Sequence, residues 1–200
     1  MENMAKINRA IRLVAQISID KSSQVLSKLV KTGAMIEMQD AFLADLPSLT
    51  ERVARENDEV VGALIDLQGD ATFKFLFFVT LNDSFLLADL LLKRPLGTTT
   101  TLDQYASSAV QEIGNILSSA IAGVFASDFD INLRPNPPVV VHDFAGSIFQ
   151  EFLISAVDQR NEILLIESRF RVVQHDIHCR MFLVPMGDSE KILSYIANTM

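Results

Sequence analysis

Cysteine, tryptophan and histidine are scarce in this chain: the 200 residues include one cysteine, no tryptophan and three histidines. The single cysteine, Cys179, excludes an internal disulfide and any metal site built from several thiolates, and it suits a reducing compartment. Cys179 lies in a strand-like apolar run, so we interpret it as a buried, unreactive thiol and not as a nucleophile. Cysteine therefore offers no chemistry here.

An excess of basic charge is also missing. The chain has 17 lysines and arginines against 25 aspartates and glutamates, for a formal net charge of -8. Nucleic acid and anionic membranes bind clustered cations, so neither is expected as a partner. The apolar stretches at 73–81 and 85–92 are too short to span a bilayer, and residues 1–12 lack the apolar core of a secretory signal. We expect a cytoplasmic protein.

The histidines and glycines give little support to a metal or nucleotide site. His175 and His178 lie near a strand turn, and the sequence places no third ligand beside them. His142 stands beside Asp143, but no serine-centred nucleophile turn accompanies the pair. Glycine-rich phosphate loops are absent. We therefore expect this chain to bind no metal and no cofactor of its own.

What the chain does have is an apolar content of 49%, enough for the core of one domain. Apolar periodicity gives the elements of the first half. They are a long helix at about 6–31, a strand at 34–38, a short helix at 47–54, strands at 60–67 and 72–81, and a helix ending near 93 that Asp83 or Ser84 could cap. The phenylalanines at 73, 75, 77 and 78 are interpreted as sheet core.

The second half repeats this order of elements after the threonine run at 98–101. The repeat consists of a long helix at 102–127, a strand at 138–142, a short helix at 145–157, strands at 162–173 and 177–184, and a helix at 189–198. We predict a single domain, 1–200, of two repeats (about 1–97 and 98–200). The fold class is α/β (α+β), a pseudo-twofold duplicated unit with a mainly antiparallel sheet and two long helices on one face.

The second long helix carries a polar stripe. Ser108, Glu112 and Asn115 lie at positions i, i+4 and i+7, and Ser119 extends the same side. The apolar residues of this helix fall on the other side and are Val110, Ile113, Leu117, Ile121 and Val124. A carboxylate and a carboxamide one turn apart are then available to a partner. By helix geometry alone, an ordinary solvated face is the better explanation of the stripe.

The spacing around the stripe resembles a family signature. Ser108-x3-Glu112-x2-Asn115, followed after twenty-two residues by Pro138, is similar at every fixed position to the Asp/Ser-x3-Glu-x2-Asn-x22-Pro motif of the CheC/CheX/FliY chemotaxis phosphatases. The letters EIGN at 112–115 are also similar to the core of that motif. That family's fold is a pseudo-twofold pair of α/β halves, so the resemblance covers nearly the whole chain and is closest to CheC.

The resemblance implies a hydrolase of two-component signalling, a phosphatase for the phospho-aspartate of a CheY-like response regulator. It implies that Glu112 forms an ion pair with the regulator's active-site lysine, that Asn115 positions the attacking water, and that Ser108 and Pro138 are supporting residues. A carboxamide suits the water because it donates and accepts hydrogen bonds and, being neutral, does not repel phosphoryl oxygens. The Mg²⁺ of the reaction belongs to the partner receiver.

The first half departs from the motif. Arg9, Leu13 and Gln16 stand at the motif positions of the first long helix, so we expect one active site per chain. Weak activity at Gln16 alone is the alternative, because its amide resembles that of asparagine. A second function hypothesis is a non-catalytic interaction module of the same fold, either FliM-like or an adaptor for a CheD-like deamidase. The intact pair of Glu112 and Asn115 favours the phosphatase.

Overall fold

The computed structural model describes residues 34–45, 58–156, 162–172 and 177–187, with single residues between 13 and 27 and between 189 and 196. The elements in chain order are β1 (Ala34–Asp45), β2 (Glu59–Gly69), β3 (Thr72–Thr80), α3 (Leu81–Leu92), α4 (Gln104–Phe129), β4 (Leu133–Pro135), β5 (Val139–Phe144), α5 (Ala145–Ala156), β6 (Glu162–Val172) and β7 (Ile177–Pro185). The predicted helix at 47–54 lies outside the described residues. The predicted helices at 6–31 and 189–198 are described at single positions, which are helical.

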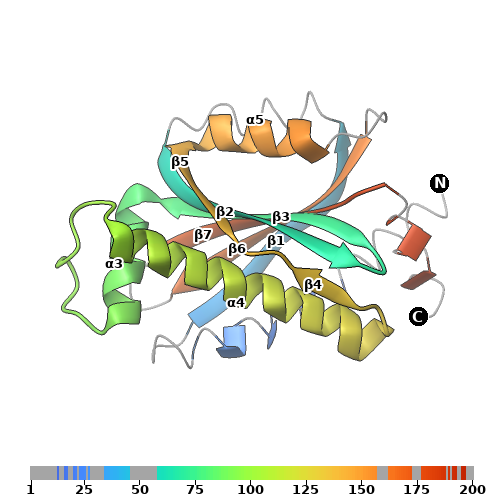
Figure 1. Ribbon diagram of the computed structural model, residues 1–200, viewed down its shortest axis with the longest axis horizontal. Coiled ribbons are helices and arrows are strands. Elements are labelled where there is room, and N and C mark those ends of the chain that lie inside the picture. Colours follow the sequence, from blue (N-terminus) through green and yellow to red (C-terminus); the bar gives the residue numbers. More distant parts are fainter. Residues whose placement is uncertain are drawn as a thin grey trace.

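The strands form one antiparallel sheet in the order β1-β6-β7-β3-β2-β4, with β5 also paired to β2. At its centre β3 of the first half pairs with β7 of the second. Outward from there, β6 pairs with β1 and β2 pairs with β5, so each half contributes its first strand to the other half's edge (Figure 1). The mainly antiparallel fold class is confirmed. This order is what a duplicated unit would give, and the repeat boundaries stay a prediction.

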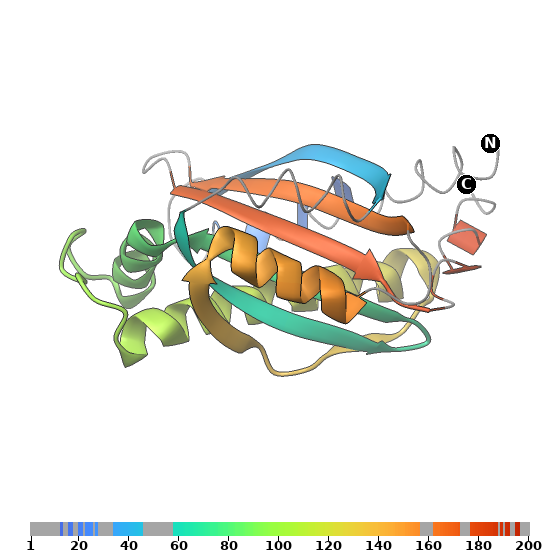
Figure 2. The ribbon, with the colours of Figure 1, turned by 90° about the horizontal axis from the view of Figure 1, so that it is seen from above.

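Helices cover both faces of the sheet. The helix α5 lies over one face, and α3 and α4 lie against the other (Figure 1); the view in Figure 2 has α5 in front of the strands and α4 behind them. The first long helix lies beside the end of α4, because the Lys21 ammonium donates to the Ser127 hydroxyl (2.7 Å) and to the Asp128 carboxylate (2.8 Å). The two long helices therefore share one face, as predicted.

The apolar side chains of β3 alternate between the two cores. Phe73, Phe75 and Phe77 face α4, whereas Leu76 and Phe78 face α5. A strand buried on both faces carries an almost continuous apolar run, so β3 lacks a polar side. The interpretation of these phenylalanines as sheet core is confirmed.

The start of α3 differs from the prediction. The residue that caps the helix is Thr80, whose hydroxyl accepts a hydrogen bond from the Asp83 N–H (3.1 Å). Ser84 is fully buried and its hydroxyl donates to the Leu81 carbonyl inside the first turn. Predicting Asp83 or Ser84 as the cap was wrong, because a threonine at the end of a strand fills the same role one turn earlier.

Two strands, β1 and β4, also differ from the prediction. The strand β1 runs to Asp45, beyond the predicted end at residue 38, because a register shift between Glu37 and Asp40 lets the pairing with β6 continue past a polar stretch. The short strand β4 was missed. Its three residues pair with the end of β2, and its proline and flanking polar residues conceal it in the sequence.

By length and composition α4 is apolar enough to cross a membrane. In the structure its apolar side packs on the sheet, where Val110, Ile113, Leu117 and Phe125 are at most 1% exposed and the Phe125 ring lies 4.9 Å from that of Phe73. Such burial is that of a core helix in a globular fold.

Candidate active site

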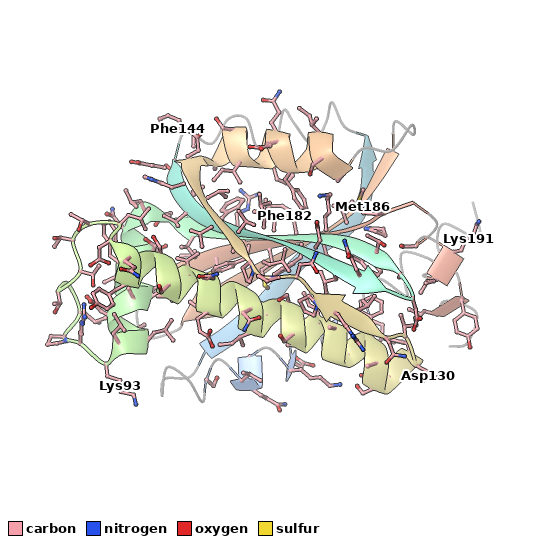
Figure 3. All side chains as sticks on the ribbon, in the orientation of Figure 1. Lys93, Asp130, Phe144, Phe182, Met186 and Lys191 are labelled. Atoms are coloured by element: carbon pink, nitrogen blue, oxygen red, sulfur yellow. The ribbon has the colours of Figure 1, made fainter. Side chains whose placement is uncertain are left out.

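The polar stripe of α4 faces away from the sheet. Ser108, Glu112, Asn115 and Ser119 are all exposed, while Val110, Ile113 and Leu117 are buried. The side chains on the outer side of α4 project into solvent (Figure 3). The predicted exposure of the stripe is confirmed.

The register of α4 is fixed at its N-terminus. The Asp103 carboxylate accepts a hydrogen bond from the Ala106 N–H (2.8 Å), which satisfies one of the free amides of the first turn. The Asp103 carbonyl accepts from the Ser107 N–H (3.0 Å), the first regular bond of the helix. From this start, Glu112 and Asn115 come in the third and fourth turns, well inside the helix and away from either fraying end.

A close approach between α4 and β2 positions the motif. A Cβ atom placed on Gly114 would lie 2.9 Å from the Ala63 Cβ, 3.4 Å from the Ile65 Cδ1 and 3.7 Å from the Pro138 Cβ. Only glycine lets the helix backbone pack this tightly without displacing β2. Glycine at this point therefore sets the height of Asn115, the next residue, above the sheet.

The same turn of α4 is bonded to Pro138. The Gln111 side-chain amide donates to the Pro138 carbonyl (3.3 Å). The structure thus brings the last residue of the motif against the turn that carries Glu112, although most of α4, a turn and β4 separate them in sequence. The twenty-two residues between Asn115 and Pro138 are the length of chain needed to complete the helix and return.

The two prolines occupy a break in the sheet. Beside β2, β4 pairs with residues 67–69 and β5 with residues 59–64, and between these ladders the Asn136 N–H donates to the Asp66 carbonyl (2.8 Å). Pro137 and Pro138 follow at once, where no further backbone donor is required. Proline therefore fits the position from which β5 starts along α4.

A buried carboxylate that the sequence analysis missed fastens the connection between α3 and α4. Asp89 is 0% exposed and accepts hydrogen bonds from the Thr98 N–H (2.9 Å), the Thr99 N–H (3.1 Å) and the Thr99 hydroxyl (2.6 Å). Burial acts to raise the pKa of Asp89, but these hydrogen bonds outweigh it and the pKa is lowered. The first two residues of the threonine run at 98–101 are therefore hydrogen-bonded to α3.

The other candidate groups lie away from the stripe. The His142 Nε2 lies 2.8 Å from the Glu59 carboxylate, and the backbone N–H of His178 donates to the Asp83 carboxylate (3.4 Å). His175 lies outside the described residues. Within the described part of the chain, no group of three or more histidine, cysteine, aspartate or glutamate side chains could hold a metal ion.

Cys179 is the buried thiol that the sequence predicts. It is fully buried in the sheet, and burial raises the pKa of its thiol well above the ordinary value, with a smaller contribution from the charge of Asp83. A thiol held in the neutral form is a poor nucleophile.

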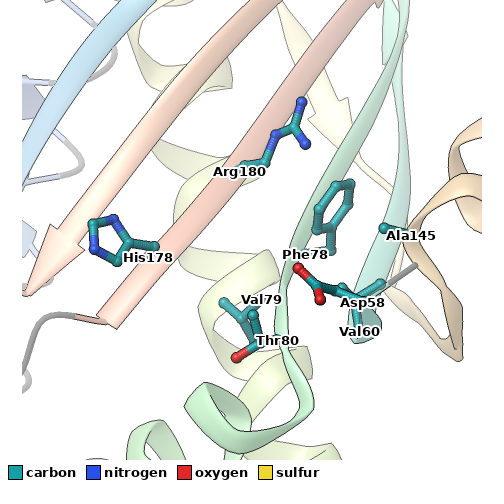
Figure 4. Close-up of a pocket in the computed structure, with 8 residues that line it drawn as sticks. All are labelled: Asp58, Val60, Phe78, Val79, Thr80, Ala145, His178 and Arg180. Carbon is teal, nitrogen blue, oxygen red and sulfur yellow. The ribbon is translucent and has the colours of Figure 1, made fainter. Parts of the chain in front are cut away.

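A pocket of about 150 Å³ opens at one end of the sheet. Its lining residues are Asp58, Val60, Phe78, Val79, Thr80, Ala145, His178 and Arg180 (Figure 4). The Arg180 guanidinium stands over the rings of Phe78 (5.5 Å) and Phe182 (5.2 Å), so its charge rests on the core of the α5 face. None of the motif residues lines this pocket.

In the first half, Leu13 and Gln16 are both helical. The Leu13 side chain is half-buried, and Gln16 is exposed, with its amide donating to the Asp20 carboxylate (3.2 Å). Arg9 lies outside the described residues. At these two positions the first helix presents a leucine and an amide that is already hydrogen-bonded within its own helix.

Residues 106–142, which contain the complete motif, match the model of the CheC-like family. The chain is also 22% identical over 183 residues to the CheY-P phosphatase CheC of Bacillus subtilis (strain 168), across 90% of this chain and 88% of that protein. The predicted resemblance to the CheC-like family is confirmed.

Solved structures share the fold of this chain. FliY of Thermotoga maritima has a TM-score of 0.73 at 14% identity, covering 99% of this chain and 96% of its own. The CheX–CheY–BeF3–Mg²⁺ complex of Borrelia burgdorferi matches with a TM-score of 0.58 at 13% identity, covering 86% and 97%. The FliM middle domain of H. pylori matches with 0.66 at 9% identity, covering 95% and 97%. At these identities the likeness establishes the fold.

Proposed function

We propose that this protein is a phosphatase that hydrolyses the phospho-aspartate of a CheY-like response regulator. The observation that carries the proposal is the pair of exposed side chains, Glu112 and Asn115, one turn apart on a helix whose other side is fixed in the core, with Pro138 held against the same turn. The name of the Bacillus relative, CheY-P phosphatase, and the pairing of CheX with CheY in the Borrelia complex support this choice of substrate.

Asn115 positions the attacking water. A phospho-aspartate is a reactive acyl phosphate, and catalysis of phosphoryl transfer is mostly positioning and electrostatic stabilisation. The carboxamide of Asn115 accepts one hydrogen bond from the water and aligns it opposite the leaving carboxylate. A carboxylate at the same place would repel the phosphoryl oxygens, so asparagine is the better residue.

Glu112 docks the substrate. Its carboxylate pairs with the receiver's active-site lysine and does not approach the phosphate itself. Glu112 and Asn115 are separated by about 4.5 Å along the helix axis, given a rise of about 1.5 Å per residue. One residue can therefore hold the lysine while the other reaches the water beside the phosphoryl group.

The Mg²⁺ of this reaction is held by the receiver, and the chain itself supplies the two side chains and a rigid surface. The proposal places the protein in the cytoplasm, in chemotaxis or a related two-component pathway. A CheD-like deamidase is a second proposed partner. Gln16 contributes no catalysis, because position 13 of its helix is a leucine where the motif has a glutamate.

A second candidate function is a non-catalytic interaction module, since the FliM middle domain has the same fold. Both functions include a protein partner, so binding alone does not separate them. Turnover does, because an interaction module leaves the lifetime of the phosphorylated receiver unchanged.

The test is a turnover experiment. A receiver is charged with a small-molecule phosphodonor in the presence of Mg²⁺, excess donor is removed, and phosphate release is followed with this protein at one-twentieth of the receiver concentration. The proposal predicts that each molecule releases many phosphates and that the receiver's phosphate is lost much faster than alone. Decay curves that coincide with and without the protein would overturn it and favour the interaction module.

A further inference from the structure

Exposed apolar side chains gather where α3 meets α4. Leu92 is 39% exposed, Leu96 is 44% exposed and Tyr105 is 56% exposed, all within the connection or the adjoining helix ends. Tyr105 lies on the outer side of α4, three residues before Ser108 and seven before Glu112. At helical spacing these positions share one side, so Tyr105 continues the polar stripe toward the N-terminus of α4.

Tyr105 is held in place by its neighbours. The Arg94 guanidinium lies over the tyrosine ring, 5.0 Å from its centroid. The backbone N–H of Arg94 donates to the Asp89 carbonyl (2.9 Å), and the Asp89 carboxylate accepts hydrogen bonds from Thr98 and Thr99 farther along the connection. The connection is thus hydrogen-bonded to α3 at two points, and the Tyr105 ring lies against the Arg94 guanidinium. Binding of a partner to Tyr105 would therefore cost little conformational entropy.

The stripe alone is too small for a stable complex. A specific interface takes about 800 Å² from each partner, which corresponds to a circular patch of about 16 Å radius. Four side chains on one helix, three of them serine or asparagine, cover a fraction of that area. Residues that dominate binding energy are enriched in tyrosine and arginine, at positions near the centre of the patch.

Distance links this surface to the proposed chemistry. Tyr105 lies ten residues before Asn115, which is about 15 Å along the helix axis at about 1.5 Å per residue. A receiver whose phospho-aspartate sits over Asn115 therefore reaches Tyr105 within an interface of ordinary size. Tyr105 and Asn115 both lie on the exposed side of α4, so one interface on this helix can include both residues.

We infer that Tyr105, with the Arg94 guanidinium over its ring, is the aromatic anchor that binds the receiver domain beside the catalytic stripe. The inference rests on the proposed function and adds the surface that determines affinity. Tyr105 is a binding residue, because it lies too far from Asn115 to touch the phosphoryl group. Arg94 is a positioning residue that acts through the tyrosine ring.

The test separates binding from hydrolysis. Binding of the intact protein to a receiver loaded with beryllofluoride and Mg²⁺ is measured for the wild type, Tyr105→Ala and Tyr105→Phe. The matched control is Ile154→Ala, which removes a side chain that is 65% exposed on α5, on the other face of the sheet. We expect Tyr105→Ala to weaken binding at least tenfold, with Tyr105→Phe within about threefold and Ile154→Ala unchanged.

Hydrolysis supplies the second readout. With the phosphorylated receiver, Tyr105→Ala should raise KM at least tenfold and leave kcat within about twofold. Equal binding by Tyr105→Ala and the wild type, alongside weakened binding by Glu112→Ala, would overturn the anchor and leave the phosphatase intact. A wild type that binds but never hydrolyses would overturn the phosphatase and leave the anchor, whereas a wild type that does not bind the loaded receiver would overturn both.

Discussion

Gly114 on α4 lies so close to Ala63 on β2 that a Cβ atom on the glycine would come within 2.9 Å of the alanine methyl group. The methyl group of Ala63 is short and fixed to its strand, so it cannot move aside as a flexible side chain would. Asn115 follows directly on the solvent side of the helix. A contact in the core therefore determines where the proposed catalytic amide stands.

Replacing Gly114 with alanine should push α4 away from the sheet. The better helix propensity of alanine contributes about 1 kcal/mol, but overpacking costs about 1–3 kcal/mol, so we expect a net loss of stability. Phosphatase activity should fall as well, since Asn115 moves with the helix. Urea unfolding and turnover of the phosphorylated receiver measure the two effects.

Gly123 is the matched control on the same helix. A Cβ atom placed there would meet nothing within 4 Å, so Gly123→Ala should stabilise the protein by about 0.5–1 kcal/mol and leave turnover unchanged. If Gly114→Ala is as stable and as active as Gly123→Ala, the close approach is not what positions the motif.

Much of the architecture was predictable because its signals are local. The alternating and continuous apolar runs identified β2, β3, β6 and β7, and the polar stripe of α4 followed from helical periodicity. The cap at Thr80 and the short β4 were missed, because a cap depends on which hydroxyl reaches a free amide and β4 exists only through its pairing with β2.

The candidate site was predictable in sequence but not in space. The motif names Glu112, Asn115 and Pro138, yet only the fold shows that Gln111 bonds to Pro138 and that Gly114 fixes the helix height. Asp89 escaped notice for the same reason. Nothing in the sequence around Asp89 indicates the threonine amide that it binds ten residues later.

Asp89→Asn should destabilise the protein near neutral pH. An amide cannot accept all the hydrogen bonds that the carboxylate receives from Thr98 and Thr99, and a buried donor left unpaired costs about 1–3 kcal/mol. Thermal unfolding and urea unfolding at pH 7 measure this loss.

The pH dependence of the wild type should share this origin. The pKa of Asp89 is lowered in the folded protein, so its carboxylate stabilises the fold fully above the unfolded-state pKa of about 3.9. That contribution is lost as the pH falls through the folded-state pKa. Stability should therefore decline more steeply below pH 4 in the wild type than in Asp89→Asn. If the free energy of unfolding falls equally steeply below pH 4 in the two proteins, Asp89 is not a charged group in the fold.

Glu112→Ala should weaken binding to the receiver. In the complex the carboxylate pairs with a lysine away from water, and truncating one member of a buried charge pair costs about 2–5 kcal/mol. Titration with the beryllofluoride-loaded receiver measures the loss. Ser119→Ala, on the same exposed stripe, is the control and should bind within about 0.5 kcal/mol of the wild type. Equal losses in both variants would argue against a specific ion pair at Glu112.

The central claim is that one amide, Asn115, supplies the catalysis. The most direct measurement is the decay of a phosphorylated receiver at saturating concentrations of three proteins: the wild type, Asn115→Ala and Gln16→Ala. The account predicts that, with Asn115→Ala, the phosphorylated receiver decays at the rate of the receiver alone. With Gln16→Ala, which alters the corresponding amide of the first half, it decays as fast as with the wild type. If the phosphorylated receiver decays as fast with Asn115→Ala as with the wild type, that result contradicts the central claim.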